Sequence, residues 1–241
     1  MLRKTFCAMV TMAALAACDV TPVQRGPAQP TGAVPQTQVS GPTLSAQQAA
    51  RSFVQVVRAV EPVAERECRT RTQGVNCDFN IVVDDRPGQP PNAFQTLDRN
   101  GRPIVAFTLA LIADARNADE LAFVLGHETA HHIAGHIDRQ QQNAVAGAVI
   151  FAGLATLTGG DASAVRSAQR LGAQVGARTY SKAFELEADE LGTIITKRAG
   201  YDPLRGAAFF TRIPDPGDKF LGTHPPNSDR IDVVRRTAAG L

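Results

Sequence analysis

The chain is poor in the residues that mark several common protein classes. It has no tryptophan, two tyrosines and only five histidines among 241 residues. Its 25 basic and 23 acidic side chains nearly cancel to a net charge of +2, so it lacks the basic field of a nucleic-acid-binding protein. Its four cysteines include no Cys-x-x-Cys pair, which excludes a redox motif of that type. The apolar content of 44% suffices for one buried core, so a single catalytic or binding domain is expected.

The N-terminus has the pattern of an export signal. A short basic start is followed by an apolar run that ends in Leu-Ala-Ala-Cys at residues 15–18. The run is too short for an ordinary transmembrane helix and predicts a signal peptide over residues 1–17. Its ending resembles the bacterial lipobox, which implies lipidation of Cys18. The alternative is a plain signal with an incidental cysteine.

The segment after the signal predicts a tether. Residues 18–44 are rich in Pro, Gly, Gln and Thr and have no apolar period, which is typical of disorder, so the folded domain is expected over residues 45–241. This organisation predicts a lipid-anchored protein of the cell envelope that faces the periplasm, on either the inner or the outer membrane. Once Cys18 is lipidated, Cys68 and Cys77 are the thiols of an exported domain, and they are expected to form a structural disulfide.

The apolar periodicities predict an α+β fold that is mainly helical and has a small, mostly antiparallel sheet. Helical spacing runs over residues 45–69 and is interrupted by Pro62, where the helix is expected to bend or end. Asn117 then caps a helix that is predicted to continue through residue 140. Between these two helices lie three strand-like segments, at residues 79–85, 92–97 and 103–109.

Four of the five histidines lie on the second of these helices, in the stretch GHETAHHIAGH. His127 and His131 are four residues apart, so their rings share one face and can hold one ion. With Glu128 between them they form HExxH, in which two imidazoles bind Zn²⁺ and the glutamate takes a proton from water. The alternative is a solvated His-rich helix that binds nothing. His132 and His136 project to other sides of a continuous helix and are expected to be packing or surface residues.

A catalytic zinc site needs a third protein ligand and leaves the fourth position to water. The metzincin pattern would supply a local third histidine, but the chain lacks both that histidine and the required glycine. A second predicted helix at residues 180–192 offers carboxylates instead. Glu185 and Asp189 line one of its faces and Glu187 points away, so spacing alone permits either glutamate as the ligand.

Taken together, four motifs in this order resemble the family of HExxH zinc metallopeptidases (gluzincins) that includes HtpX, BepA and the CAAX prenyl endopeptidase. The motifs are Asn92-Ala93-Phe94, the run from Glu120 to Glu128, Tyr180-Ser181-Lys182 with Glu185 and Asp189, and His224-Pro225-Pro226 with Arg230.

The resemblance implies a role for each matched residue. His127, His131 and Glu185 would be the zinc ligands, one ion per chain, with Glu128 as general base. Asp189 would hold a histidine ring in its ligating tautomer.

His224 and Arg230 match a pair that the family places at the mouth of the site. The resemblance implies that they stabilise the oxyanion, or that His224 swings in as a fourth ligand that shuts the enzyme off. The plainer interpretation is a Pro-rich turn and a salt bridge.

Two further segments bear on substrate and membrane. The uncharged residues 143–160 are at the short limit for a transmembrane span and are expected to pack beside the active site, near the membrane or under the substrate. A substrate strand is expected to pair with the edge of the sheet at residues 103–109.

These features predict a zinc metalloendopeptidase of the bacterial envelope that cleaves unfolded or misassembled proteins, which would be its partners. The alternative function is a chaperone or assembly factor with the same fold, in which cleavage is latent or suppressed by His224.

Overall fold

A computed structural model describes residues 44–179, 181–215, 217 and 224–241. The predicted signal peptide, the lipidation site Cys18, the predicted tether up to residue 43, and Tyr180 lie outside the described residues. All the described residues belong to one compact unit.

The first element, α1 (Ala46–Arg71), begins at a complete capping box. The Ser45 hydroxyl accepts from the backbone N–H of Gln48, and the Gln48 side chain accepts from the backbone N–H of Ser45. Pro62 lies inside the helix and does not end it. The apolar stripe that was expected from the sequence is buried, with Val56 and Val60 completely covered.

A three-stranded sheet follows, with the spatial order β1-β3-β2. β1 (Asn80–Asp84) pairs with β3 (Pro103–Thr108) in parallel, and β2 (Ala93–Leu97) pairs with β3 in antiparallel register. The mainly helical α+β class is therefore confirmed, but the sheet is mixed rather than mostly antiparallel. The expectation that residues 103–109 form the edge is wrong, because the parallel ladder to β1 occupies the second side of β3. Among the described residues, β1 and β2 are the two edge strands of this sheet.

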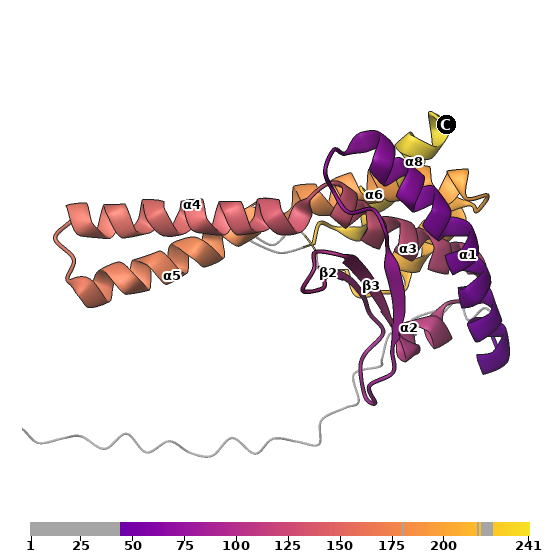
Figure 1. Ribbon diagram of the computed structural model, residues 1–241. Coiled ribbons are helices and arrows are strands. Elements are labelled where there is room, and N and C mark those ends of the chain that lie inside the picture. The colour runs from indigo at the N-terminus through magenta and orange to yellow at the C-terminus, as the bar shows by residue number, and fades with distance from the viewer. Residues whose placement is uncertain (1–43, 180, 216, 218–223) are drawn as a thin grey trace, which may run out of the picture. The chain divides into compact units, whose positions relative to one another are not determined.

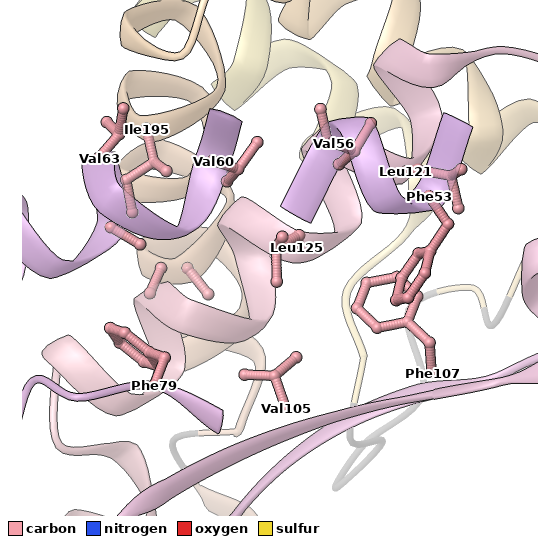
Figure 2. Packing of buried hydrophobic residues seen from close by; sticks show 14 of the residues in the cluster. Phe53, Val56, Val60, Val63, Phe79, Val105, Phe107, Leu121, Leu125 and Ile195 are labelled. Carbon is pink, nitrogen blue, oxygen red and sulfur yellow. The ribbon is translucent and has the colours of Figure 1, made fainter. Parts of the chain in front are cut away.

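The core lies between this sheet, α1 and the two helices that carry the predicted ligands, at residues 118–133 and 181–198 (Figure 2). The rings of Phe53 in α1 and Phe107 in β3 pack with centroids 5.1 Å apart. α2 (Leu109–Asp114) leads from the sheet into α3 (Ala118–Ile133), and Asn117 caps α3 as predicted by accepting from the N–H of Glu120.

The helix that carries the histidines is shorter than predicted. α3 ends at Ile133, and Gly135 adopts a left-handed φ of +66°, after which α4 (His136–Leu157) starts in a new direction. Glycine accepts this conformation without the Cβ clash that other residues meet. The position of His136 relative to His131 therefore cannot be calculated from one continuous helix, as it was above, whereas His132 still lies within α3.

α4 and α5 (Ala162–Thr179) form a long antiparallel hairpin that extends away from the sheet and α3, and it meets them near its base (Figure 1). The described helices include none with both the length and the apolar character needed to cross a membrane. Residues 143–160 thus form most of a projecting helix instead of packing over the active site.

The chain then returns to the core through α6 (Ser181–Arg198), which packs along α3. α7 (Pro203–Ala207), a 3-10 turn (Ala208–Thr211) and α8 (Asn227–Ala239) complete the described structure.

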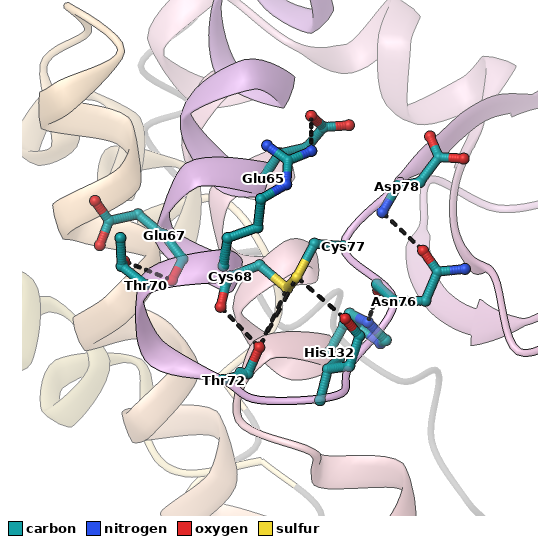
Figure 3. The surroundings of a disulfide bond; sticks show 11 residues. Glu65, Glu67, Cys68, Thr70, Thr72, Asn76, Cys77, Asp78 and His132 are labelled. Atoms are coloured by element: carbon teal, nitrogen blue, oxygen red, sulfur yellow. Dashed lines mark hydrogen bonds and ion pairs between the residues drawn. A yellow bond between two sulfur atoms is a disulfide. The ribbon is translucent and has the colours of Figure 1, made fainter.

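A disulfide links Cys68 near the end of α1 to Cys77 before β1, which confirms the predicted pair (Figure 3). The Thr72 hydroxyl, which donates to the Cys68 carbonyl, lies next to both sulfur atoms. The loop that the disulfide closes also reaches α3, because the Asn76 carbonyl lies 2.7 Å from Nε2 of His132. The disulfide therefore restrains a loop that contacts the histidine-bearing helix at His132, away from the predicted ligands.

Candidate metal centre

Two neighbouring helices bring the three predicted ligands together. On α3, Nε2 of His127 lies 3.0 Å from Nε2 of His131. Glu185 on α6 places one carboxylate oxygen 3.6 Å from the first of these nitrogens and the other 3.4 Å from the second. The potential ligand atoms of the three residues lie within 4.8 Å of one another. Two imidazole nitrogens and one carboxylate oxygen form the donor set of a catalytic zinc site.

α3 and α6 can approach this closely because glycines face each other beside the ligands. A Cβ on Gly192 would lie 2.8 Å from the backbone N of His127, and a Cβ on Gly126 would lie 2.8 Å from the carbonyl oxygen of Gly192. Any larger residue would force the two backbones apart. The glycine pair thus sets the distance between the histidines and Glu185.

Asp189 and Arg230 fix the orientation of the His127 ring through its Nδ1 atom. Its Nδ1 lies 2.9 Å from a carboxylate oxygen of Asp189, which is completely buried. Arg230 on α8 donates to both oxygens of Asp189, from Nε and from a terminal nitrogen, each at 2.7 Å. An ionised Asp189 accepts the proton on Nδ1 and leaves the lone pair of Nε2 directed toward Glu185. Arg230 is itself buried, lines the cleft and also lies 3.4 Å from Glu185.

The ring of His131 is held by a second chain of contacts that the sequence interpretation missed. Its Nδ1 lies 2.8 Å from Nδ1 of His136, the first residue of α4. Nε2 of His136 lies 3.2 Å from the carboxylate of Glu187, which also accepts from Arg139 at 2.8 Å. Burial and the neighbouring His131 lower the pKa of His136 to about 4, so its ring is neutral near pH 7.

One tautomer assignment satisfies all of these contacts. If His136 donates from Nε2 to Glu187, its Nδ1 accepts from His131, and the lone pair of His131 Nε2 then points toward His127 and Glu185. The alternative that spacing left open, Glu187 as a ligand, is excluded by geometry, because Glu187 is occupied with His136 and Arg139. The signal that could have revealed this network is Gly135, since glycine after a run of helical residues is typical of a helix end.

The electrostatics of the site keep Glu185 ionised. Burial alone would raise its pKa, but the neighbouring His131 and His224 and the charge of Arg230 hold the pKa well below its usual value. Nδ1 of His224 lies 3.2 Å from Glu185, and this contact raises the pKa of His224. A carboxylate that stays ionised is ready to bind a cation.

The three residues open into a cleft of about 610 Å³. Glu128 lines it, half-buried, on the same face of α3 as the ligands. His224 lies at its more exposed side, with 56% of its side chain accessible. The opposite wall is formed by β2 and the residues before it, including Asn92, Phe94 and Gln95. The cleft therefore places a carboxylate, a cation-binding triad and a strand edge around one space.

The structure brings together seven of the predicted site residues around this cleft: His127, Glu128, His131, Glu185, Asp189, His224 and Arg230. His132 points away toward the disulfide loop, where its ring packs edge-on against Phe79. It takes no part in the centre, as predicted. His136, which was assigned the same status, contacts a ligand directly.

Comparison with known proteins agrees with this geometry. The model of a family described as Peptidase family M48 matches residues 50–238. A beta-barrel assembly-enhancing protease of Yersinia pestis is 30% identical over 169 residues, which cover 61% of this chain and 32% of that protein. The protein of the same name in Escherichia coli K12 is 28% identical over an equal length. Mitochondrial metalloendopeptidase OMA1 of Saccharomyces cerevisiae is 28% identical over 173 residues, which cover 68% of this chain and 47% of the yeast protein. The chain thus spans about a third of the length of the bacterial relatives and about half of the yeast relative.

Proposed function

The chain belongs to peptidase family M48, a family of metallopeptidases, and from this membership we propose that it is a zinc-dependent endopeptidase of the bacterial cell envelope. We further propose that its substrates are unfolded or misassembled proteins. The observation that carries the proposal is the convergence of His127, His131 and Glu185 on one point in a cleft that Glu128 also lines. A structural zinc site would fill all four positions with protein ligands and would have no use for Glu128.

In the proposed mechanism, His127, His131 and Glu185 hold the zinc ion, and Asp189 and His136 keep both rings in the ligating tautomer. When bound, zinc supplies Lewis acidity, which makes water nucleophilic at neutral pH and polarises the substrate carbonyl. Glu128 takes the proton from the attacking water and returns it to the nitrogen of the leaving amine. His224 is an exposed imidazole beside Glu185, and it would donate a hydrogen bond to the oxygen on which negative charge develops.

The substrate is proposed to bind as an added strand. β2 pairs only with β3 among the described residues, which leaves it one unpaired edge, and residues 92–95 line the cleft. Pairing through backbone groups recognises an extended chain with little dependence on its sequence. This mode suits unfolded polypeptides, which can supply an extended segment, and it excludes folded domains without exposed strands.

The envelope location rests on the predicted signal peptide and on lipidation of Cys18. The bacterial relatives carry the name beta-barrel assembly-enhancing protease, and we propose that this chain likewise acts on envelope proteins that fail to assemble. The lipid would hold the domain at a membrane, on its periplasmic side, within reach of such proteins.

A second candidate function is an assembly factor in which cleavage is latent. The contact of His224 with Glu185 favours it, because a histidine that approaches the ligand set can occupy the position that water needs. In that case removal of the imidazole would release activity.

The test is digestion of unfolded casein by the zinc-loaded chain from residue 19 onward, beside a Glu128→Gln variant prepared identically. The substitution keeps size and hydrogen bonding but removes the base, so cleavage by the wild type alone is expected. Cleavage by both would indicate a contaminating protease and remove support for the role of Glu128. Silence in both, with activity appearing in His224→Ala, would favour the latent assembly factor over the constitutive protease.

A further inference from the structure

The outward side of the α4–α5 hairpin is apolar and uncovered. Along α4, large apolar side chains are exposed on one half of the helix circumference, which runs from the side opposite Gly147 to the edge of the contact with α5 and is called the outward face below. These residues and their exposed fractions are Val145 58%, Val149 66%, Ile150 66%, Leu154 60% and Leu157 87%. From the first to the last they cover about 18 Å of helix at 1.5 Å per residue. No ionisable residue occurs anywhere in residues 143–160.

The hairpin does not use these side chains for its own packing. Its seam is made of small residues: a Cβ on Gly147 would lie 2.1 Å from the carbonyl oxygen of Gly172, and one on Gly176 would lie 2.0 Å from that of Asn143. Such close backbone contact through small residues is how helices associate where lipid, rather than water, surrounds them. The apolar half of α4 is left for another contact, because a helix that is apolar on all sides is normally covered on all sides.

The charge on the hairpin points to the nature of that contact. Between residues 140 and 180 the only acidic residue is Asp161, whereas Arg166, Arg170 and Arg178 are all exposed on α5. The hairpin is therefore basic in a chain that is nearly neutral overall. An uncharged apolar helix paired with a helix that carries exposed arginines is complementary to the headgroup and acyl boundary of an anionic bilayer.

We propose that the outward face of α4 is a lipid-binding surface that inserts into one leaflet of an anionic membrane, with the hairpin lying on that membrane rather than crossing it. No described helix can span the bilayer, so interfacial insertion is the mode that remains. The chain between Cys18 and Leu44 has 26 residue steps, which reach at most about 90 Å. A lipid on Cys18 would thus keep the hairpin close to the bilayer, and the hairpin would then orient the cleft relative to it.

The absence of tryptophan provides a probe. In the chain from residue 19 onward, which carries no lipid, Ile150→Trp introduces the only tryptophan, and its fluorescence reports the surroundings of α4 alone. Gln55→Trp, on the exposed side of α1, is the matched control. With vesicles that contain phosphatidylglycerol and brominated acyl chains, we expect quenching and a blue shift for tryptophan at position 150 and no change at position 55.

A charge variant tests the same surface without a probe. Val149→Glu adds one negative charge to the apolar face, and Gln55→Glu adds the same charge elsewhere. We expect the first to lower vesicle partitioning by at least about tenfold, the factor that corresponds to loss of one buried aliphatic side chain, and the second to leave it within about twofold. Equal folding of both variants is verified by thermal unfolding.

Three results would overturn the proposal. The first is no quenching at position 150 at any lipid concentration. The second is a blue shift without lipid that grows with protein concentration and accompanies dimer formation, which would assign the face to a second copy of the chain. The third is equal binding of the Val149→Glu variant. Equal partitioning to phosphatidylcholine vesicles would overturn the part assigned to the arginines.

Discussion

At the residue scale, His136 connects His131, a proposed zinc ligand, to the protein surface. Its buried ring stacks on Phe184 at 4.6 Å between centroids, which fixes the plane in which it meets His131. Beyond it, Glu187 and Arg139 complete the chain and are partly open to solvent. A ligand held in this way loses little conformational freedom when it binds a metal.

Replacement of His136 by Gln should weaken zinc binding by about 10–100-fold. The single amide group of Gln cannot accept a hydrogen bond from His131 and donate one to Glu187 from the positions that the two ring nitrogens of His136 occupy. Zinc affinity measured by competition with a chromophoric chelator tests this directly and needs no activity. His132→Gln is the matched control, since that ring is adjacent in sequence but contacts only the Asn76 carbonyl and Phe79. Equal affinities of the two variants would show that His136 does not position the ligand.

Helical spacing alone predicted only the residues whose relation depends on one helix, whereas Glu185 and its neighbours in the site came from the family resemblance. His127 and His131 are a single turn apart, so their common face follows from helix geometry. His136 lies beyond a helix break, and its contact with His131 depends on the new direction that α4 takes after Gly135. That direction comes from packing between distant parts of the chain, which local spacing does not contain.

At the scale of the elements, the metal centre depends on how closely α3 and α6 pack. Gly192→Ala should disturb it, because the new Cβ would meet backbone atoms of His127 and Gly126 at 2.8–3.1 Å and none of them is a flexible side chain. We expect a loss of about 1–3 kcal/mol in unfolding free energy and weaker zinc binding. Thermal unfolding and chelator competition measure the two effects.

Gly153→Ala is the control for this change, because position 153 lies in α4 and a Cβ there meets nothing within 4 Å. That variant should be neutral or up to about 1 kcal/mol more stable, since alanine favours a helix more than glycine does. If both alanines behaved alike, the close contact between the helices would not limit the position of Glu185.

An ion pair joins α1 to α6 and makes stability depend on pH. Buried Glu67 in α1 accepts hydrogen bonds from Arg198 in α6 and Arg71 in α1. Burial would raise the pKa of Glu67, but the two arginines lower it below its ordinary value of 4.5. A lowered folded-state pKa means that the pair stabilises the protein above the unfolded-state pKa and that this stabilisation is lost as the pH falls through the folded-state value.

Arg198→Ala should therefore cost about 1–2 kcal/mol of unfolding free energy near neutral pH, and the cost should shrink as the pH falls through the folded-state pKa of Glu67, below which that carboxyl is protonated in both proteins. Urea unfolding at several pH values measures the difference. Arg69→Ala, which removes an exposed pair with Glu65, is expected to cost less than about 0.5 kcal/mol at every pH. A cost for Arg198→Ala that did not change with pH would mean that packing of the arginine stem, and not its charge, joins the helices.

The sheet shows why strands can be located from the sequence and their order cannot. Each predicted segment overlaps an observed strand, because turn residues and apolar runs mark strand ends locally. In the sheet, β3 lies between β1 and β2, so β1 pairs in parallel with a strand that follows it in sequence only after β2. Local sequence signals do not specify which of two distant segments a strand pairs with. The error affects the functional interpretation, since it assigned the substrate edge to residues 103–109, whereas β2 is the edge strand that lines the cleft.

At the scale of the whole molecule, the centre joins parts that are distant in the chain. The ligands come from α3 and α6, and the supporting contacts come from α4 and α8. A metal ion bound there must hold all four helices in their native arrangement, and the unfolded chain cannot hold it in the same way. Metal binding should therefore stabilise the whole domain.

We expect zinc at about 100 times its dissociation constant to raise the unfolding free energy by about 2.7 kcal/mol over the chelator-treated protein. The midpoint of thermal unfolding, followed by circular dichroism as zinc is titrated, measures this shift. The matched control is Glu185→Gln, which keeps the size of the side chain but removes the charge that faces both imidazoles. Its midpoint should rise much less with zinc, whereas that of Glu187→Gln should follow the wild type more closely, since Glu187 supports His136 but is not a ligand. Equal shifts for wild type and Glu185→Gln would place the stabilising metal elsewhere and would remove Glu185 from the ligand set.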